Sequence, residues 1–237
     1  MYTAIIVEPR KHKALEYVLQ NACECLSHDW NIIVFHGDMN AEYTHAIVNK
    51  LNKTHNNRIQ VINIHIGNLT QMEYCDLLAT KSILYDSINT ELFLVFQTDS
   101  LILRANADIL DNFLNYDYVG APWRKTNYIP TKNCDFIGNG GFSLRRKSKM
   151  LEIIEKIDWH SLPNDPTKVE DLYFSTNYPG ISVHKPTYEQ ACTFCIDEVY
   201  SEIAFACHKP WTIPHQYEVL KNKYPEVEML RLLQDSE

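Results

Sequence analysis

Short apolar runs alternate with amphipathic stretches through the first hundred residues of the chain. Runs rich in apolar and β-branched residues predict buried strands at residues 2–10, 30–38, 59–66 and 92–99. The segments between them repeat apolar residues at helical spacing and predict helices at residues 12–26, 41–51 and 72–88. This alternation predicts an α/β fold, a Rossmann-like, mostly parallel central sheet flanked by helices.

The pattern changes beyond residue 103. It predicts a helix running into a strand or turn at 107–123, then a glycine-rich loop, a short strand and a helix at 134–157. A helix start is expected at 169–178, a strand or loop at 197–211 and a helical tail at 217–237. No repeat or flexible linker divides the chain, so we expect a single domain, with halves at 1–103 and 104–215 and a tail at 216–237.

Composition narrows the class of protein. The 237 residues are 45% apolar and 11% aromatic, which is enough for an ordered core. A net charge of −8 argues against a nucleic-acid binder, which needs a basic face. The N-terminal apolar stretch is too short for a signal peptide, and no run reaches the roughly 18 apolar residues of a membrane span. We therefore expect a cytoplasmic protein in a bacterial, viral or host-cytosol setting.

Polar residues interrupt the apolar pattern where the predicted strands end. Glu8 and Arg10 follow the first strand, and Gln97, Thr98 and Asp99 follow the fourth. Ligands of open α/β sheets bind beyond the carboxyl ends of the strands. A carboxylate at such an end suits a divalent cation that bridges phosphates, because that cation takes few protein ligands.

Three of the seven glycines fall together in the sequence IGNGGFSLR, at positions 138, 140 and 141. A hairpin turn is one explanation, since Asn-Gly is a strong turn signal. We favour a loop that packs against a ligand, because two consecutive glycines exceed what a two-residue turn requires.

Two further polar groups have both a structural and a chemical interpretation. Glu170 and Asp171 open a predicted helix, where the helix dipole alone would favour them, but either could serve as a general base. His208 and Lys209 could bind a metal and phosphate, or be structural. A zinc or redox site on Cys192, Cys195 and Cys207 is a further alternative to buried core thiols.

The order of five motifs resembles a known family. FQTDSLIL, YDYVGAPW, GNGGFSLRRKSKML, VEDLYFS and CHKPW together resemble a poorly characterised group of glycosyltransferase-like domains, over about residues 3–212. More distantly, the layout is similar to glycosyltransferases of the GT-A fold. This resemblance implies a GT-A-like fold with an elaborated acceptor-side C-terminal half. Gln97 departs from the Asp-x-Asp motif of those enzymes, which puts the need for a metal in doubt.

The resemblance also implies roles for individual residues. Asp99 and His208 would bind Mn²⁺ or Mg²⁺, and Asp171, with Glu170 as second choice, would be the catalytic base. The loop beneath the sugar and acceptor would comprise Asn139, Gly140 and Gly141. Residues expected at the donor are Glu8, Arg10, Gln97, Thr98, Asp99, Trp123 and Lys209.

The function implied is a glycosyltransferase, inverting and metal-assisted, that moves a hexose from a UDP- or GDP-sugar to a glycan or protein acceptor. Two alternatives stay open: a non-catalytic sugar or nucleotide-sugar binding module, and a sugar-phosphate nucleotidyltransferase. The latter usually has a glycine-rich phosphate loop after its first strand, where this chain reads EPRKHK.

Overall fold

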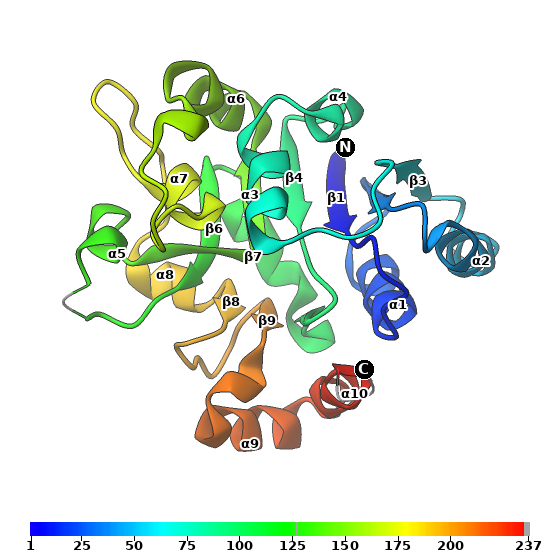
Figure 1. The fold of residues 1–237 in the computed structure, drawn as a ribbon. Helices are drawn as coiled ribbons and strands as arrows, with labels where there is room; N and C mark the ends of the chain where they lie inside the picture. Colours follow the sequence, from blue (N-terminus) through cyan, green and yellow to red (C-terminus); the bar gives the residue numbers. More distant parts are fainter. Residues whose placement is uncertain (127, 235–237) are drawn as a thin grey trace.

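The computed structural model describes residues 1–126 and 128–234 and is built on a six-stranded sheet (Figure 1). The strand order is β3-β2-β1-β4-β7-β6. The first four strands along the chain are mutually parallel, whereas β7 runs antiparallel to both β4 and β6. The mostly parallel sheet expected from the sequence is therefore confirmed. The strands are β1 (Tyr2–Val7), β2 (Trp30–His36), β3 (Ile59–Asn63), β4 (Leu92–Val95), β6 (Tyr118–Pro122) and β7 (Ile137–Arg146).

The strand order creates a crevice at the carboxyl ends of two neighbouring inner strands, β1 and β4. The chain moves outward from β1 to β2 and β3, then returns to the other side of β1 to form β4. At such a switch point the two connections leave in opposite directions, and a ligand site opens at the carboxyl ends of the strands. Glu8, just after β1, and Gln97 to Asp99, just after β4, lie at this point.

Helices cover both faces of the sheet because successive side chains of a buried strand point to opposite faces. Ala4 and Ile6 of β1 pack with the apolar sides of α1 (Leu15–Cys25) and α2 (Ala41–Asn52). Ile5 packs on the other face. The helices of that face are α3 (Gln71–Ala79), α4 (Ile83–Ser87), α6 (Lys147–Lys156) and α7 (Glu170–Ser175).

A second, three-stranded sheet joins distant parts of the chain. Its order is β5-β9-β8, and β5 pairs antiparallel with β9 so that Ser100 lies opposite His208. This register places His208 beside Asp99, although more than a hundred residues separate them along the chain. The strands are β5 (Ser100–Ile102), β8 (Cys195–Ile196) and β9 (Ala206–His208).

Two local features differ from the sequence-based prediction. The single helix expected at 72–88 is divided into α3 and α4, because Ser82 accepts a hydrogen bond from the backbone of Leu84 and starts a new helix. The predicted glycine-rich loop of Asn139, Gly140 and Gly141 is part of strand β7, which pairs with β6 through an irregular register after Gly120.

The C-terminal tail forms two helices beneath the second sheet, α9 (Pro214–Lys223) and α10 (Pro225–Gln234) (Figure 1). Pro225 separates them, since proline cannot continue the hydrogen-bonding of a helix interior. Residues 235–237 of the predicted tail lie outside the described residues. The remaining helices are α5 (Ile129–Asn133), α8 (Tyr188–Cys192) and the 3₁₀ helices η1 (Arg104–Phe113), η2 (Trp159–Ser161) and η3 (Pro210–Thr212).

Across the described ranges, no helix has the length and apolar character that crossing a bilayer requires. The division of the chain at residues 103 and 215 stays a prediction.

Candidate active site

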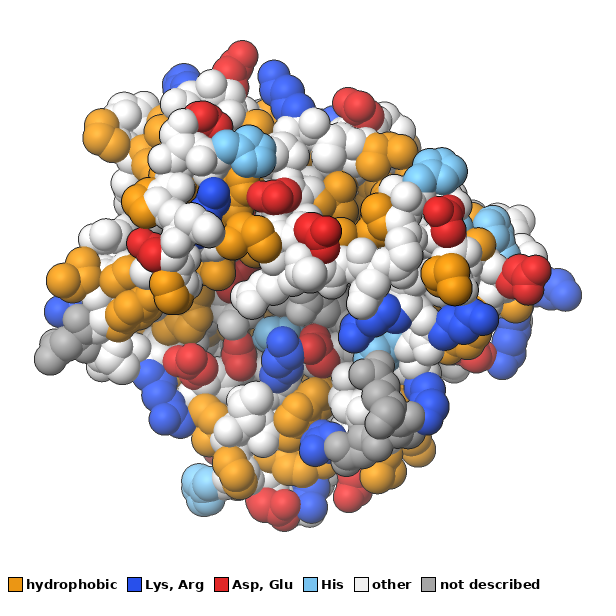
Figure 2. Space-filling view, in the orientation of Figure 1, with side chains coloured by type: hydrophobic (Ala, Val, Ile, Leu, Met, Phe, Trp, Pro, Cys, Tyr) orange, Lys and Arg blue, Asp and Glu red, His pale blue; other side chains and the backbone are white. Residues whose placement is uncertain are grey.

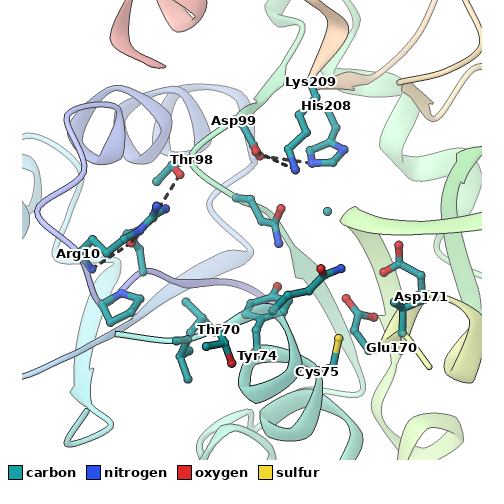
Figure 3. A pocket seen from close by; sticks show the side chains of 18 of the residues that line it. Arg10, Thr70, Tyr74, Cys75, Thr98, Asp99, Glu170, Asp171, His208 and Lys209 are labelled. Carbon is teal, nitrogen blue, oxygen red and sulfur yellow. Dashed lines mark hydrogen bonds and ion pairs between the residues drawn. The ribbon is translucent and has the colours of Figure 1, made fainter. Parts of the chain in front are cut away.

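A cavity of about 580 Å³ opens where the crevice between β1 and β4 meets the second sheet (Figure 3). On the face shown in Figure 2, acidic, basic and histidine side chains gather around the middle of the molecule. The cavity receives residues from the ends of β1 and β4, the start of α3, strands β7 and β9, and the start of α7. Of the residues predicted for the site, it is lined by Glu8, Arg10, Gln97, Thr98, Asp99, Asn139, Gly141, Glu170, Asp171, His208 and Lys209.

One wall of the cavity carries Asp99 between two basic side chains. Asp99 Oδ1 lies 3.3 Å from His208 Nε2, and Asp99 Oδ2 lies 3.3 Å from Lys209 Nζ. The backbone reinforces this arrangement, because the Lys209 N–H donates to the Asp99 carbonyl oxygen at 3.0 Å. Lys209 adopts a left-handed conformation with φ of 43°. This conformation is uncommon outside glycine, and it turns the chain sharply after β9.

Asp197 supports His208 from behind, and sequence reasoning missed it. Its Oδ2 lies 3.3 Å from His208 Nδ1 and accepts a hydrogen bond of 2.5 Å from the Asn139 side chain. The available signal was an acid directly after the short run FCI, at the end of a strand-like segment, as Asp99 is. Asp197 follows β8, whose Ile196 pairs with Cys207, so the second sheet positions both neighbours of His208.

These contacts determine the charges of the Asp99 and His208 side chains. Burial works against ionisation of Asp99, but His208 and Lys209 hold the pKa of its carboxyl well below the usual range. Burial likewise opposes a charged imidazole, yet the Asp99 and Asp197 carboxylates raise the pKa of His208 to about 9. In the absence of a cation, this wall therefore carries a partly buried ionic group.

The opposite wall carries the acidic pair of α7. Glu170 points inward and accepts a 2.9 Å hydrogen bond from the Arg145 guanidinium, and both side chains are almost fully buried. The Glu170 carboxylate keeps the pKa of Arg145 above its ordinary value despite burial. Asp171 lines the cavity and also borders a second cavity beside it. Of the two acids, Asp171 is thus the one available to a substrate.

Strand β7 passes between these two walls, and its glycines make the passage possible. A Cβ atom on Gly140 would collide with the carboxylates of Asp171 and Glu170, and one on Gly141 would collide with the His208 ring. Both residues have ordinary strand conformations, so close approach explains them and backbone freedom does not.

Glu8 and Arg10 form a unit at the far end of the cavity. Glu8 Oε1 accepts from the Arg10 backbone N–H at 3.0 Å and from Arg10 Nε at 2.8 Å, and Oε2 accepts from Arg10 Nη2 at 2.9 Å. Thr98 also donates to Glu8 Oε2, at 3.2 Å. The Glu8 carboxylate is therefore occupied by the protein, and its effect on a ligand would pass through Arg10.

Two further predicted residues, Gln97 and Trp123, differ in their relation to the cavity. Gln97 lines the cavity, and its backbone N–H donates to Ser100 Oγ at 2.9 Å, which fixes the turn before Asp99. Trp123 does not line the main cavity. It borders a neighbouring cavity of about 330 Å³ that shares Val169 and Asp171 with the first.

The Asp99–His208 wall fits a divalent cation. Asp99 Oδ1 and His208 Nε2 are buried and have no hydrogen-bond partner, although they face each other at 3.3 Å. Adjacent ligands of an octahedral ion at about 2.0–2.1 Å lie roughly 3 Å apart. No cluster of three or more metal-binding side chains occurs in the described part of the chain, so a bound substrate would have to supply further ligands.

The structure does not favour the alternative of a zinc or redox site on three cysteines. Cys195 and Cys207 are fully buried in β8 and β9, and Cys192 is partly buried at the end of α8. Burial raises the pKa of all three thiols, which disfavours the thiolate that metal binding and redox chemistry require.

The fold is that of GT-A glycosyltransferases. The galactosyltransferase LgtC, solved with donor and acceptor sugar analogues, superposes with a TM-score of 0.58 over 99% of this chain and 95% of that chain, at 11% identity. A mannosyltransferase from Pyrobaculum calidifontis, PcManGT, solved with GDP-Man and Mn²⁺, gives 0.51 over 78% of this chain at 14% identity. The resemblance inferred from the motifs is thus confirmed for the fold.

The same comparisons define the family and the extent of the match. The chain belongs to the family described as "Protein of unknown function (DUF5672)", which matches residues 58–210. The sequence matches no curated protein. GlyE of Streptococcus pneumoniae TIGR4, in its apo form, gives a TM-score of 0.52 at 11% identity and over 89% of this chain. The chain spans about half the length of PcManGT and GlyE, at 54% and 56%.

Proposed function

We propose that this protein is a glycosyltransferase that transfers a sugar from a nucleotide-sugar donor to an acceptor hydroxyl with inversion at the anomeric carbon. The observation that carries the proposal is the cavity itself. A candidate cation site and an available carboxylate face each other across one space at the switch point of an α/β sheet. The fold shared with LgtC and PcManGT supports glycosyl transfer in general, and inversion is our own proposal.

The donor would lie along the wall from Arg10 to Lys209. Arg10, held by Glu8, would contact the nucleoside, and Lys209, beside Asp99, would contact the diphosphate. Asp99 and His208 would hold Mn²⁺ or Mg²⁺, which when bound offsets the negative charge of the departing diphosphate. Lys209 adds a positive charge to the same region, a contribution that matters more because Gln97 brings none.

Asp171 would act as the general base. It takes the proton of the acceptor hydroxyl as the hydroxyl oxygen bonds to the anomeric carbon and the bond from that carbon to the diphosphate oxygen breaks. Glu170 is hydrogen-bonded to Arg145, and we assign it the role of positioning the start of α7. The adjoining cavity, bordered by Asp171 and Trp123, is the proposed side of entry for a glycan or protein acceptor.

A panel of UDP- and GDP-sugars with and without Mn²⁺ tests donor binding, because a ligand of the native state raises the melting temperature. For the donor that binds, Asp171→Asn should lower turnover by about 10²–10⁴-fold with donor affinity preserved, since a positioned base contributes that much.

Asp135→Asn is a matched control, because Asp135 is exposed and pairs with Lys185 away from the cavity. It should keep normal turnover. Unchanged turnover in Asp171→Asn would reject Asp171 as the base.

A non-catalytic nucleotide-sugar binding module is the second candidate. Gln97 favours it, because the site offers one acid where the Asp-x-Asp motif offers two. This candidate predicts donor binding in the thermal panel with no release of nucleoside diphosphate, whatever acceptor is supplied.

A further inference from the structure

Unpaired polar atoms are concentrated at the cavity. In residues 1–126 and 128–234, a few buried side-chain atoms lack a hydrogen-bond partner: Thr44 Oγ1, Tyr74 OH, Asp99 Oδ1, Arg145 Nη1, His208 Nε2 and Gln216 Oε1. Tyr74, Asp99 and His208 line the same cavity. Buried polar groups are normally paired, so each exception calls for a specific explanation. A bound cation would account for the unpaired atoms of Asp99 and His208, but it would not account for the unpaired hydroxyl of Tyr74.

Tyr74 is held firmly in place. It lies in the first turn of α3, where Thr70 and Glu73 form a capping box and the Tyr74 backbone N–H donates to the Thr70 carbonyl at 3.0 Å. Figure 3 shows its ring on the wall opposite Asp99 and His208, with Arg10 to one side and Glu170 to the other. Gln97 is a candidate partner for the hydroxyl, since burial raises the pKa of Tyr74 and the Gln97 side chain lowers it, but the geometry of the two groups does not meet that of a hydrogen bond.

Other buried tyrosines on the same side of the sheet are satisfied. The Tyr85 hydroxyl donates to the Leu78 carbonyl at 2.7 Å, and the Tyr118 hydroxyl donates to the Gly138 carbonyl at 2.7 Å. Leaving a buried hydroxyl unpaired costs folding free energy, so phenylalanine at position 74 is expected to leave the protein at least as stable. Such a cost is expected where the group serves a ligand.

We propose that the Tyr74 hydroxyl hydrogen-bonds a hydroxyl of the donor sugar and thereby helps to select the donor. This inference rests on the proposed function. The positions of Arg10, Lys209 and Asp171 assign the other walls to nucleoside, diphosphate and acceptor, which leaves the sugar in front of Tyr74.

The chemistry of the wall agrees with a neutral, hydroxylated ligand. A phenol hydroxyl both donates and accepts, as a sugar hydroxyl does. A phosphate is disfavoured at this position, because the charged groups that act on the hydroxyl are two acids, Glu170 and Asp171, and a single base, Arg145.

The test compares the nucleotide sugar that gives the largest thermal shift with its nucleoside diphosphate, by calorimetric titration of wild type and Tyr74→Phe. The variant should bind the nucleotide sugar about three- to tenfold more weakly, the value of one neutral hydrogen bond. Affinity for the nucleoside diphosphate should be unchanged. The melting temperature without ligand should stay the same or rise.

Tyr85→Phe is the matched control, since it removes a hydroxyl whose bond is made within the protein. It should lower the melting temperature and leave both affinities unchanged. A donor analogue that lacks the paired sugar hydroxyl should bind wild type and Tyr74→Phe equally.

The outcomes separate the two proposals. If wild type binds the nucleotide sugar and Tyr74→Phe binds it equally well, the role of Tyr74 is wrong and the proposed function stands. If Tyr74→Phe weakens the nucleoside diphosphate to the same extent, Tyr74 contacts the nucleotide and the inference is overturned. If wild type binds neither ligand, the proposed function fails, and the inference with it.

Discussion

Two charged groups face each other across the cavity and differ in how completely they are paired. On the α7 side, Glu170 and Arg145 are both buried and joined by a 2.9 Å hydrogen bond. On the β9 side, His208 is buried and Asp99 is partly buried, and their facing atoms lie 3.3 Å apart with no hydrogen bond. The difference separates architecture from function: the first pair is hydrogen-bonded within the protein, although Arg145 Nη1 is left without a partner, whereas the facing atoms of the second have capacity left for a ligand.

Breaking the hydrogen-bonded pair of Glu170 and Arg145 should have the largest effect on stability. Arg145→Met leaves the Glu170 carboxylate buried without its partner, which typically costs about 3–5 kcal/mol in the free energy of unfolding. Lys156→Met is the control, because Lys156 pairs with Glu152 on an exposed helix face and should contribute no more than about 0.5 kcal/mol. Denaturant unfolding measures both, and equal losses would contradict the contrast drawn between the two walls.

Binding of a divalent cation between Asp99 and His208 should stabilise the protein. Mn²⁺ at a hundred times its dissociation constant should add about 2.7 kcal/mol to the free energy of unfolding. Asp99→Asn should abolish this response, because it removes a charged oxygen ligand. Asp117→Asn should keep it, because Asp117 pairs with Arg146 outside the cavity. Thermal shift with and without Mn²⁺ measures the effect, and a full response in Asp99→Asn would exclude Asp99 as a ligand.

Lys209 should give the smallest change in stability. Its side chain is nearly half exposed, and its contact with Asp99 is 3.3 Å, so Lys209→Met should alter the free energy of unfolding by no more than about 1 kcal/mol. The same variant should bind the donor diphosphate more weakly, with less dependence on salt. A loss of stability as large as that of Arg145→Met would show that the Asp99 group is a structural pair.

The sequence was sufficient where the structure depends on local patterns. The parallel strands and the polar residues at their ends follow from apolar runs that stop at Glu8 and Gln97. The positions of Asp99, Asp171 and His208 at one cavity agree with the motif order. These features could be predicted because they recur along the chain or belong to a known motif.

The remainder depends on contacts between distant segments. Asp197 reaches His208 only because β8 and β9 pair, and Arg145 reaches Glu170 only because β7 passes beside α7. Tyr74 reads in the sequence as one of several aromatic residues on a helix. The glycines at 140 and 141 predicted a loop, because consecutive glycines are locally typical of loops. The sequence cannot show that the acids of α7 and the His208 ring pack closely against the strand at these two positions.

Those two glycines limit how the enclosed space could change. A single backbone, with only hydrogen atoms on its facing carbons, separates the carboxylates of α7 from the imidazole of β9. The gap between these groups is therefore as narrow as a polypeptide allows, and any substitution at either position would widen it. Room for a bulkier molecule would have to come from elsewhere in the lining, at the start of α3 or in the segments around Trp123, with this partition left untouched.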